Sequence, residues 1–360
     1  MMSSPKPVFL TKFNERTDNP GDMLIFDCLL NLLQQYGSVY CLMEVPWSKH
    51  KPENLSRKDL LCLGLRCAWS RIMQRPIPLY LVYPPGAVVR KWYSAGREVP
   101  IDWAKKTIKD FLWRLAGRRS ILMGASCYDP SFLEDFGISI LGLRDESSLR
   151  AFSESANCKV FYCPDLSLTA NSSEVSKNGL ETFLSFRKFD AANSHSKLDE
   201  NALEESLRRL LPVLDSAGAR IHFFNQVEED EDYNQQLSQR LPDGPANWLE
   251  GPNYGNFQQF YLPASFVMSN RLHVLLVGAL AGAIPVAFVS KSHTKVISAY
   301  RKLEWEQLVI PIESLNIEQQ LKDILENKDK FRDLVRQTIH RERAIAHKLF
   351  ADIFNPQTSP

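Results

Sequence analysis

Residues Phe266 to Val289 read Phe-Val-Met-Ser-Asn-Arg-Leu-His-Val-Leu-Leu-Val-Gly-Ala-Leu-Ala-Gly-Ala-Ile-Pro-Val-Ala-Phe-Val. The apolar start predicts a buried strand, the middle predicts an apolar helix, and the end led by Pro285 predicts a second strand. A basic turn ending at Lys295 follows. Strand, helix and strand in this order form the repeating unit of a parallel sheet, so the sequence predicts an α/β fold.

The turn between the first strand and the helix carries the chemistry of this unit. Ser269 and Asn270 are good N-cap residues, and a helix start favours a phosphate or carboxylate through its unpaired N–H groups and its dipole. Arg271 supplies a planar fork for oxyanions, and His273 can exchange a proton near neutral pH. These two side chains share a pocket only if the helix begins no earlier than Arg271. The structural alternative is a surface arginine and a core histidine bonded to a backbone carbonyl.

The composition is that of an ordinary globular protein with room for two domains, since 44% of its 360 residues are hydrophobic. A net charge of +1, from 43 basic and 42 acidic residues, gives no electrostatic case for nucleic acid. The longest apolar run, 274–289, is interrupted by two glycines and a proline and is too short to span a membrane. The N-terminus lacks the apolar core of a secretion signal, so we expect a cytoplasmic protein.

The cysteines point to the same compartment. There are seven, an odd number, and none forms a C-x-x-C pair. Several lie inside apolar segments, which indicates buried free thiols in a reducing environment. No zinc site is expected.

Strand and helix patterns alternate along the first half, which predicts a doubly wound sheet. Strands are expected at 7–13, 38–44, 77–82, 119–124, 138–143 and 158–162, and helices at 23–35, 58–74, 101–115 and 146–156. In the second half we expect strands at 182–186 and 219–224, helices at 204–214 and 232–240, then the opening unit, and C-terminal helices over 317–349.

Two Rossmann-like domains facing a cleft result, with the first at 1–168, a polar linker at 169–179 and the second at 180–330. An amphipathic last helix in 331–360 is expected to pack back on the body. The acidic run 228–232 is interpreted as a solvated loop and helix start, with metal binding as the alternative.

Several predicted loops lie at the carboxyl ends of strands, where open parallel sheets collect ligands. Asn19-Pro-Gly21-Asp22 follows the first strand: Gly21 permits an unusual backbone turn there, and Asp22 caps the next helix. Arg144 follows a later strand, and Arg187 ends the first strand of the second domain, a good place for an anion.

Taken in order, these segments resemble the polysaccharide pyruvyl transferase family over roughly residues 8–300. The resemblance lies in order and spacing, because Arg-Leu-His alone is a weak motif. One departure is the early Gly-rich loop of the family, which is reduced here to Tyr83-Pro-Pro-Gly-Ala87. The matching segments are Asn19-x-Gly21-Asp22, Arg144-Asp145-x-x-Ser148, Pro164-Asp165, Ser185-x-Arg187, and Arg271-Leu-His273 continuing to Ile284-Pro285 and Lys295.

The resemblance implies a glycosyltransferase-B-like architecture and transfer of an enolpyruvyl unit from phosphoenolpyruvate to a sugar, usually closing as a ketal on a hexose. It implies phosphoenolpyruvate as co-substrate on the C-terminal domain, with no metal or redox cofactor, and the acceptor on the N-terminal domain. A lipid-linked oligosaccharide acceptor would bring the protein to the inner face of the cytoplasmic membrane. The basic, aromatic segment 90–103 is a candidate for that contact, with a solvated loop as the alternative.

Phosphoenolpyruvate carries a phosphate and a carboxylate, so its site needs several cations and helix N-termini. Arg187, Arg271 and Lys295 are the expected anion binders. His273 is the leading general acid and Asp22 a candidate base or acceptor-orienting group, with the assignment between them open. The remaining candidate contacts to substrate are Asn19, Gly21, Arg144, Ser269 and Asn270.

Two alternatives remain. A nucleotide-sugar glycosyltransferase of the same architecture is one, because Glu318 and Glu326 have a spacing seen in retaining enzymes, although such spacing is common by chance on a charged helix. A non-catalytic subunit of a polysaccharide-assembly complex, with a vestigial cleft, is the other.

Overall fold

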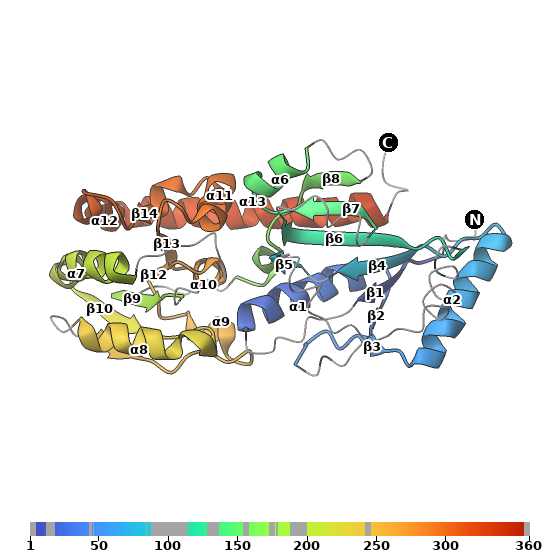
Figure 1. The fold of residues 1–360 in the computed structure, drawn as a ribbon, viewed down its shortest axis with the longest axis horizontal. Coiled ribbons are helices and arrows are strands. Elements are labelled where there is room, and N and C mark those ends of the chain that lie inside the picture. Colours follow the sequence, from blue (N-terminus) through green and yellow to red (C-terminus); the bar gives the residue numbers. More distant parts are fainter. Residues whose placement is uncertain are drawn as a thin grey trace.

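A computed structural model describes residues 5–11, 19–42, 45, 47–83, 85–87, 113, 115–127, 137–153, 158–172, 177, 179–187, 200–241 and 246–355. The chain forms an elongated molecule of two α/β halves lying side by side, each built on a parallel sheet (Figure 1). The predicted fold class is confirmed. Most of the predicted helix at 101–115 and the candidate membrane segment 90–103 lie outside the described residues.

The N-terminal sheet has the strand order β3-β2-β1-β4-β6-β7-β8, with β5 paired to β6. Every strand pair is parallel. The strands are β1 (Val8–Thr11), β2 (Ser38–Cys41), β3 (Glu53–Asn54), β4 (Leu79–Tyr83), β5 (Gly86–Ala87), β6 (Arg119–Ser126), β7 (Ile138–Leu143) and β8 (Lys159–Tyr162). The described residues of this half also form helices α1 (Pro20–Gln34), α2 (Arg57–Ile72) and α6 (Glu146–Ala151) and the 3-10 turn η1 (Leu166–Thr169).

The start of α1 differs from the prediction. The helix begins at Pro20, and its cap is Asn19, whose side-chain oxygen accepts from the Gly21 N–H at 3.1 Å. Proline at the first helical position has the right φ and no N–H to leave unpaired, which moves the start three residues earlier than expected. The prediction that Asp22 is the cap is therefore wrong, since Asp22 lies in the first turn. Gly21 is helical, so the expected unusual turn there is also wrong.

The C-terminal sheet has the order β11-β10-β9-β12-β13-β14, again all parallel. Its strands are β9 (Leu180–Ser185), β10 (Ala219–Phe223), β11 (Ala246–Trp248), β12 (Phe266–Ser269), β13 (Ile284–Val289) and β14 (Val309–Pro311). The other elements are α7 (Glu200–Ser216), η2 (Glu228–Asp230), α8 (Glu231–Arg240), α9 (Phe257–Phe260), α10 (Leu272–Leu280), α11 (Thr294–Leu303), η3 (Glu306–Leu308), α12 (Ile317–Glu326) and α13 (Lys328–Phe354).

Helix α10 is the central helix of the molecule, and every one of its residues is buried. A helix that is apolar on all sides is stable only where other elements cover it. It packs against β12 and β13 of its own half and contacts α1 of the other half. Gly278 permits the close approach to the sheet, because a Cβ there would lie 2.6 Å from Val267 Cγ2. The stretch that predicts the fold thus forms its core.

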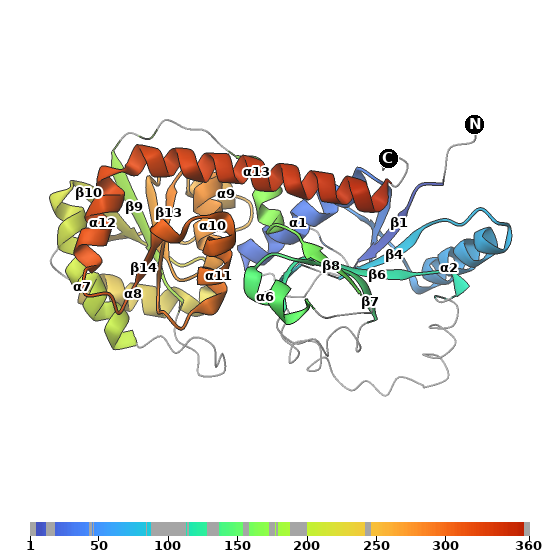
Figure 2. The ribbon, with the colours of Figure 1, turned by 90° about the horizontal axis from the view of Figure 1, so that it is seen from above.

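Helix α13 joins the two halves. It starts beside α12, runs across the C-terminal half and ends at the N-terminal sheet (Figure 2). Arg343 Nε donates to the Leu168 carbonyl at 3.3 Å, and Glu342 accepts from the Tyr162 hydroxyl. At its end, the Phe354 ring packs on Phe9 at a centroid distance of 4.8 Å and on Tyr80 at 5.1 Å. One helix therefore belongs to both cores.

All seven cysteines are free, as expected for a reducing compartment, and Cys62 is exposed while Cys158 is partly so. Across the described part of the chain, no helix combines the length and the apolar character needed to cross a bilayer. Four short strands, β3, β5, β11 and β14, were not predicted, because two or three residues show no alternation.

Replacing Phe354 with alanine should lower the free energy of unfolding by about 3 kcal/mol, since the ring is buried between aromatic side chains of the N-terminal half. Denaturant unfolding measures the loss. Lys348→Ala, an exposed change on the same helix, is the control and should be near neutral. Equal losses in the two variants would contradict this account of α13.

Candidate active site

The loops predicted to hold ligands converge where the two halves meet. From the N-terminal half come the start of α1 and the loops after β7 and β8, which carry Arg144 and Asp165. From the C-terminal half come the loop between β12 and α10 and the start of α11. Contacts between α1 and α10, between α10 and η1 and between α6 and α11 bring the two sets together.

Arg144, Asp165 and His273 form a buried polar cluster across this junction. Arg144 Nη1 makes an ion pair with Asp165, and the same nitrogen lies 3.2 Å from His273 Nε2. His273 Nε2 is 3.6 Å from Asp165 Oδ2. Arg144 is 3% exposed, Asp165 6% and His273 9%, so bulk water screens none of these interactions strongly.

Asp165 is held in the charged form. Burial raises its pKa, but the ion pair with Arg144 and the interaction with His273 outweigh that effect and leave the pKa well below its ordinary value. Ser167 adds two donors to Asp165 Oδ1, its N–H at 3.0 Å and its hydroxyl at 2.6 Å. The pair is therefore a fixed feature of the site across the neutral pH range.

Arg144 retains an unused donor. Its Nε donates to the Ser126 hydroxyl at 2.9 Å, and its Nη1 is engaged by Asp165 and His273. Its Nη2 is buried with no hydrogen-bond partner among the described residues. A buried unpaired N–H of a guanidinium is costly unless a ligand satisfies it, so this nitrogen marks a place for an acceptor atom.

The other ring nitrogen of His273 faces Asp22. His273 Nδ1 lies 3.6 Å from Asp22 Oδ1, and Asn19 Nδ2 donates to Asp22 Oδ2 at 2.9 Å. The side chain of Asp22 is 30% exposed, which makes this the open side of the histidine. Asn19 and Asp22 thus belong to the same cluster as His273, as predicted from their places at strand ends.

Gly21 allows the two halves to approach at this point. A Cβ at position 21 would lie 2.6 Å from His273 Cβ and 3.0 Å from Gln226 Nε2. Carbon atoms do not approach this closely, so any side chain at position 21 would push the start of α1 away from α10. The requirement for glycine comes from close packing between the halves and not from the backbone conformation of the turn.

Arg271 points elsewhere. Helix α10 begins at Leu272 with Arg271 as its N-cap, as the shared-pocket geometry requires. Arg271 Nε, however, makes an ion pair with Asp230, which is 1% exposed. The interpretation of residues 228–232 as a solvated loop is therefore wrong for Asp230. His273 and Arg271 contact different carboxylates, and a common ligand for the two stays a prediction.

Ser269 and Asn270 hold strand ends together. The Ser269 hydroxyl accepts from the Arg271 N–H at 2.9 Å and donates to the Ser185 carbonyl. Asn270 Oδ1 accepts from the Arg187 N–H at 2.7 Å, and its Nδ2 donates to the Arg187 carbonyl at 3.3 Å. Both polar side chains thus fix the loop that carries Arg187 beside the start of α10. Neither makes a cap hydrogen bond to that helix.

Lys295, in the first turn of α11, is a cation in a cationic setting. Burial and the positive charges of Arg144 and Arg187 lower its pKa to about 8, while Asp22 and Asp165 oppose the shift. His293, the N-cap of α11, has its pKa lowered to about 4 by burial, Lys295 and Arg187. The imidazole is therefore neutral at neutral pH. Lys295, Arg144 and Arg187 thus share this region with two carboxylates, Asp22 and Asp165.

Sequence reasoning left out three residues of this region. Asp165 was part of a matching segment but had no role assigned, although it comes three residues after a strand, at the same edge of the sheet as Arg144. Asp230 was hidden inside an acidic run. His293 lies two residues before Lys295, and nothing in the local sequence signals its burial. Among the described residues, no group of three or more histidine, cysteine or carboxylate side chains has the arrangement of a metal site.

Solved structures with the same architecture place the fold in the glycosyltransferase-B class. A glycosyltransferase from Rickettsia africae matches with a TM-score of 0.58 and 8% identity, over 98% of each chain. A UDP-GlcNAc 2-epimerase from Neisseria meningitidis, solved with UDP-GlcNAc bound, matches with a TM-score of 0.55 and 9% identity, over 96% of this chain and 98% of the other. At such identities the likeness concerns the fold alone.

The sequence itself is more specific. Residues 19–292 match the polysaccharide pyruvyl transferase family, and the chain belongs to that family. The match begins at the cap of α1 and ends just before the start of α11, so it contains Asp22, Arg144, Asp165 and His273. No relative among the curated proteins matches the sequence.

Replacing Asp165 with asparagine should lower the free energy of unfolding by about 3–5 kcal/mol, because it leaves the Arg144 charge buried without its counter-charge. Urea unfolding measures this loss. Glu146→Gln breaks a solvent-exposed pair with Arg150 and should cost at most about 1 kcal/mol. A near-neutral Asp165→Asn would show that the buried pair does not stabilise the junction.

Proposed function

We propose that this protein transfers the enolpyruvyl unit of phosphoenolpyruvate to a hexose of a surface polysaccharide or of its lipid-linked precursor, and closes it as a pyruvate ketal. The observation that carries the proposal is the buried cluster of Arg144, Asp165 and His273 at the junction of the halves. It places a proton-transfer group next to an arginine with an unused donor, inside a family defined by pyruvyl transfer.

The cations of the site suit the charge of phosphoenolpyruvate. Arg144 offers its buried Nη2, Lys295 lies in the first turn of α11, and Arg187 lies close enough to Lys295 to lower its pKa. Starts of α1, α10 and α11 lie in the same region. Such groups compensate the negative charges of a phosphate and a carboxylate in the absence of water.

The two ring nitrogens of His273 have different hydrogen-bonding partners. A guanidinium only donates, so the Arg144 contact requires a lone pair on Nε2, which places the proton of the neutral ring on Nδ1, facing Asp22. When the ring takes a second proton, Nε2 changes from acceptor to donor, so it gives up the Arg144 hydrogen bond and Asp165 accepts from it, while Asp22 accepts from Nδ1. The imidazolium is thus supported on both sides, and Nδ1 is the side that can reach a substrate.

In the proposed reaction, imidazolium Nδ1 donates a proton to the methylene carbon of phosphoenolpyruvate, and the cationic character develops at the adjacent carbon. One hydroxyl of the hexose adds to that carbon and passes its proton to Asp22, which returns it to His273 Nδ1 and restores the imidazolium. The bond from the carbon to the phosphate oxygen then breaks, the second hydroxyl adds, and inorganic phosphate leaves with the remaining proton. Two hydroxyl protons are lost and two are taken up, one by the methyl group and one by phosphate.

Replacing His273 with glutamine should reduce kcat at least about 100-fold, the typical contribution of a positioned general acid. Phosphate release from phosphoenolpyruvate in the presence of acceptor glycan measures turnover, and the product should gain about 70 Da, the mass of pyruvate less water. His340→Gln, an exposed change on α13, is the matched control. The proposal fails if the wild type releases no phosphate from phosphoenolpyruvate but uses a nucleotide sugar.

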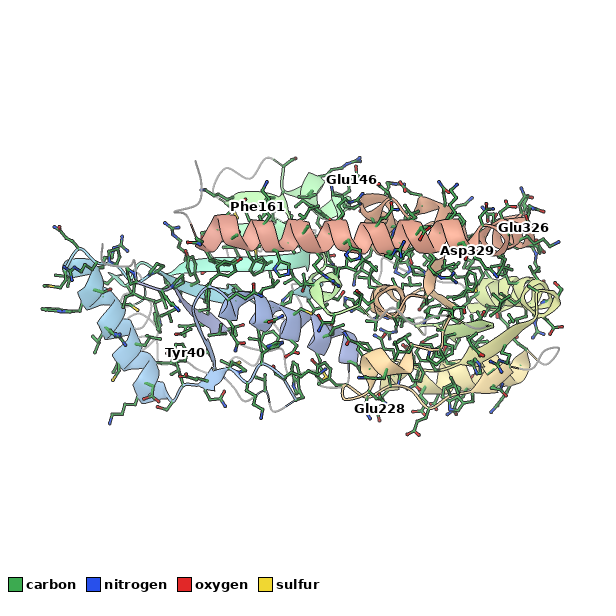
Figure 3. All side chains as sticks on the ribbon, turned by 180° about the vertical axis from the view of Figure 1, so that it is seen from behind. Tyr40, Glu146, Phe161, Glu228, Glu326 and Asp329 are labelled. Carbon is green, nitrogen blue, oxygen red and sulfur yellow. The ribbon has the colours of Figure 1, made fainter. Side chains whose placement is uncertain are left out.

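The residues behind the glycosyltransferase alternative lie away from this site. Glu318 forms a two-pronged ion pair with Arg209 of α7, with both bonds at 2.7 Å. Glu326 is exposed at the outer end of the C-terminal half, near Asp329 (Figure 3). A non-catalytic assembly subunit is tested separately, because His273→Gln would then leave polysaccharide output intact.

Anion affinity should depend on pH through Lys295. The pKa of Lys295 is about 8 in the free protein and rises when an anion binds. Above pH 8, binding therefore takes up a proton. The affinity for the anion then falls by up to about tenfold per pH unit, until the pH reaches the pKa of the bound state. Titration calorimetry with phosphoenolpyruvate at several pH values measures this. Lys295→Arg should remove the fall, because the guanidinium stays charged; persistence of the same fall would assign it to another group.

A further inference from the structure

The outer face of α2 is apolar and exposed to solvent. Of the eight large apolar side chains that are exposed on the described residues, five lie on this helix or on the residue after it. Their exposed fractions are 52% for Leu61, 50% for Leu65, 64% for Trp69, 70% for Ile72 and 57% for Met73. Scattered exposed apolar residues need no explanation, but a concentration on a single helix indicates a contact surface.

These side chains form one stripe. Leu61, Leu65 and Trp69 are four residues apart, and Ile72 follows three later, which is the spacing of neighbours along one face of a helix. The opposite face is apolar as well, since Cys67 is buried and Leu60 and Leu63 pack on the core below β1 and β4. The helix is therefore held to the sheet by one apolar face while it presents another.

Basic residues surround the stripe. Lys58, Arg66, Arg71 and Arg75 are exposed, and the segment 57–75 contains five basic residues and one acidic residue. That acid, Asp59, is engaged in the cap of the helix, where it bonds to Ser56. An apolar stripe bordered by arginine and lysine matches the boundary between the acyl chains and the headgroups of an anionic bilayer.

We propose that α2 docks this protein on the surface of a bilayer that contains anionic phospholipids. The helix stands at the outer end of the N-terminal half, away from the C-terminal half and α13, in both perpendicular views (Figures 1 and 2). A flat surface can therefore reach it. A second copy of the chain fits less well, because pairing two such faces would bring like charges together. The inference does not rest on the proposed reaction.

Vesicle sedimentation with the full chain tests the surface. The wild type should sediment with vesicles of phosphatidylcholine mixed with phosphatidylglycerol, and less with phosphatidylcholine alone. Added salt should weaken the binding, because it screens the basic residues. The absence of sedimentation with anionic vesicles at low salt overturns the proposal.

The double variant Leu65→Gln/Trp69→Gln should bind anionic vesicles about tenfold or more weakly, because two large apolar side chains no longer enter the bilayer. Leu315→Gln is the matched control: that leucine is 89% exposed in the C-terminal half, and its replacement should leave binding unchanged. Lys58→Gln/Arg66→Gln should weaken binding mainly at low salt. All these side chains are exposed, so thermal unfolding should be unaffected.

Two further results would overturn the proposal. One is equal vesicle binding by the wild type and the Leu65→Gln/Trp69→Gln variant. The other comes from sedimentation velocity without lipid: a wild-type dimer that the same double variant converts to monomer, together with no vesicle binding, would make this face an interface between copies of the chain.

Discussion

The buried ion pair between Arg144 and Asp165 is the interaction on which the site depends. Both residues follow strands of the N-terminal sheet, β7 and β8, and both are almost completely buried. Taking two charges out of water is unfavourable unless their geometry and their remaining hydrogen bonds are satisfied, and Ser126 and Ser167 supply part of that satisfaction. A further contact, to Arg144 Nη1, comes from His273, a residue of the other half. The charge pair is complete only when the two halves are docked, so formation of the site and docking of the halves are the same event.

Two features hold the halves in that position. Helix α13 starts in the C-terminal half and ends in the aromatic cluster of the N-terminal sheet, which ties the halves together far from the site. At the site itself, Gly21 lets the start of α1 lie against His273, since the position has no room for a Cβ. Long-range attachment alone would permit sliding of one half over the other. Close packing at Gly21 restricts it, because the ring of His273 must keep both Arg144 and Asp22 within reach.

Local patterns explain how much of this could be predicted. The unit 266–289 was predictable because a fully buried strand, helix and strand are apolar along their whole length. The boundary of α1 was misplaced because proline at N1 and asparagine at the cap outweigh a later aspartate. The burial of Asp230 could not be predicted, since an acidic run is ordinarily solvated and only the distant Arg271 makes burial favourable. Partners separated by more than a hundred residues, such as Arg144 and His273, leave no local trace in one sequence.

The cations Arg144, Arg271 and Lys295 fall into two electrostatic classes. Arg271 is matched by Asp230, and Arg144 by Asp165, so each of these guanidinium charges has a carboxylate in direct contact. Lys295 is in the opposite situation, because its burial and the positive charges of Arg144 and Arg187 outweigh the carboxylates and lower its pKa. A dianion that entered beside Lys295 would reverse that balance, favour the ammonium form and strengthen its own binding. The paired arginines therefore give the site its shape, while Lys295 is the cation whose charged form a bound anion would stabilise.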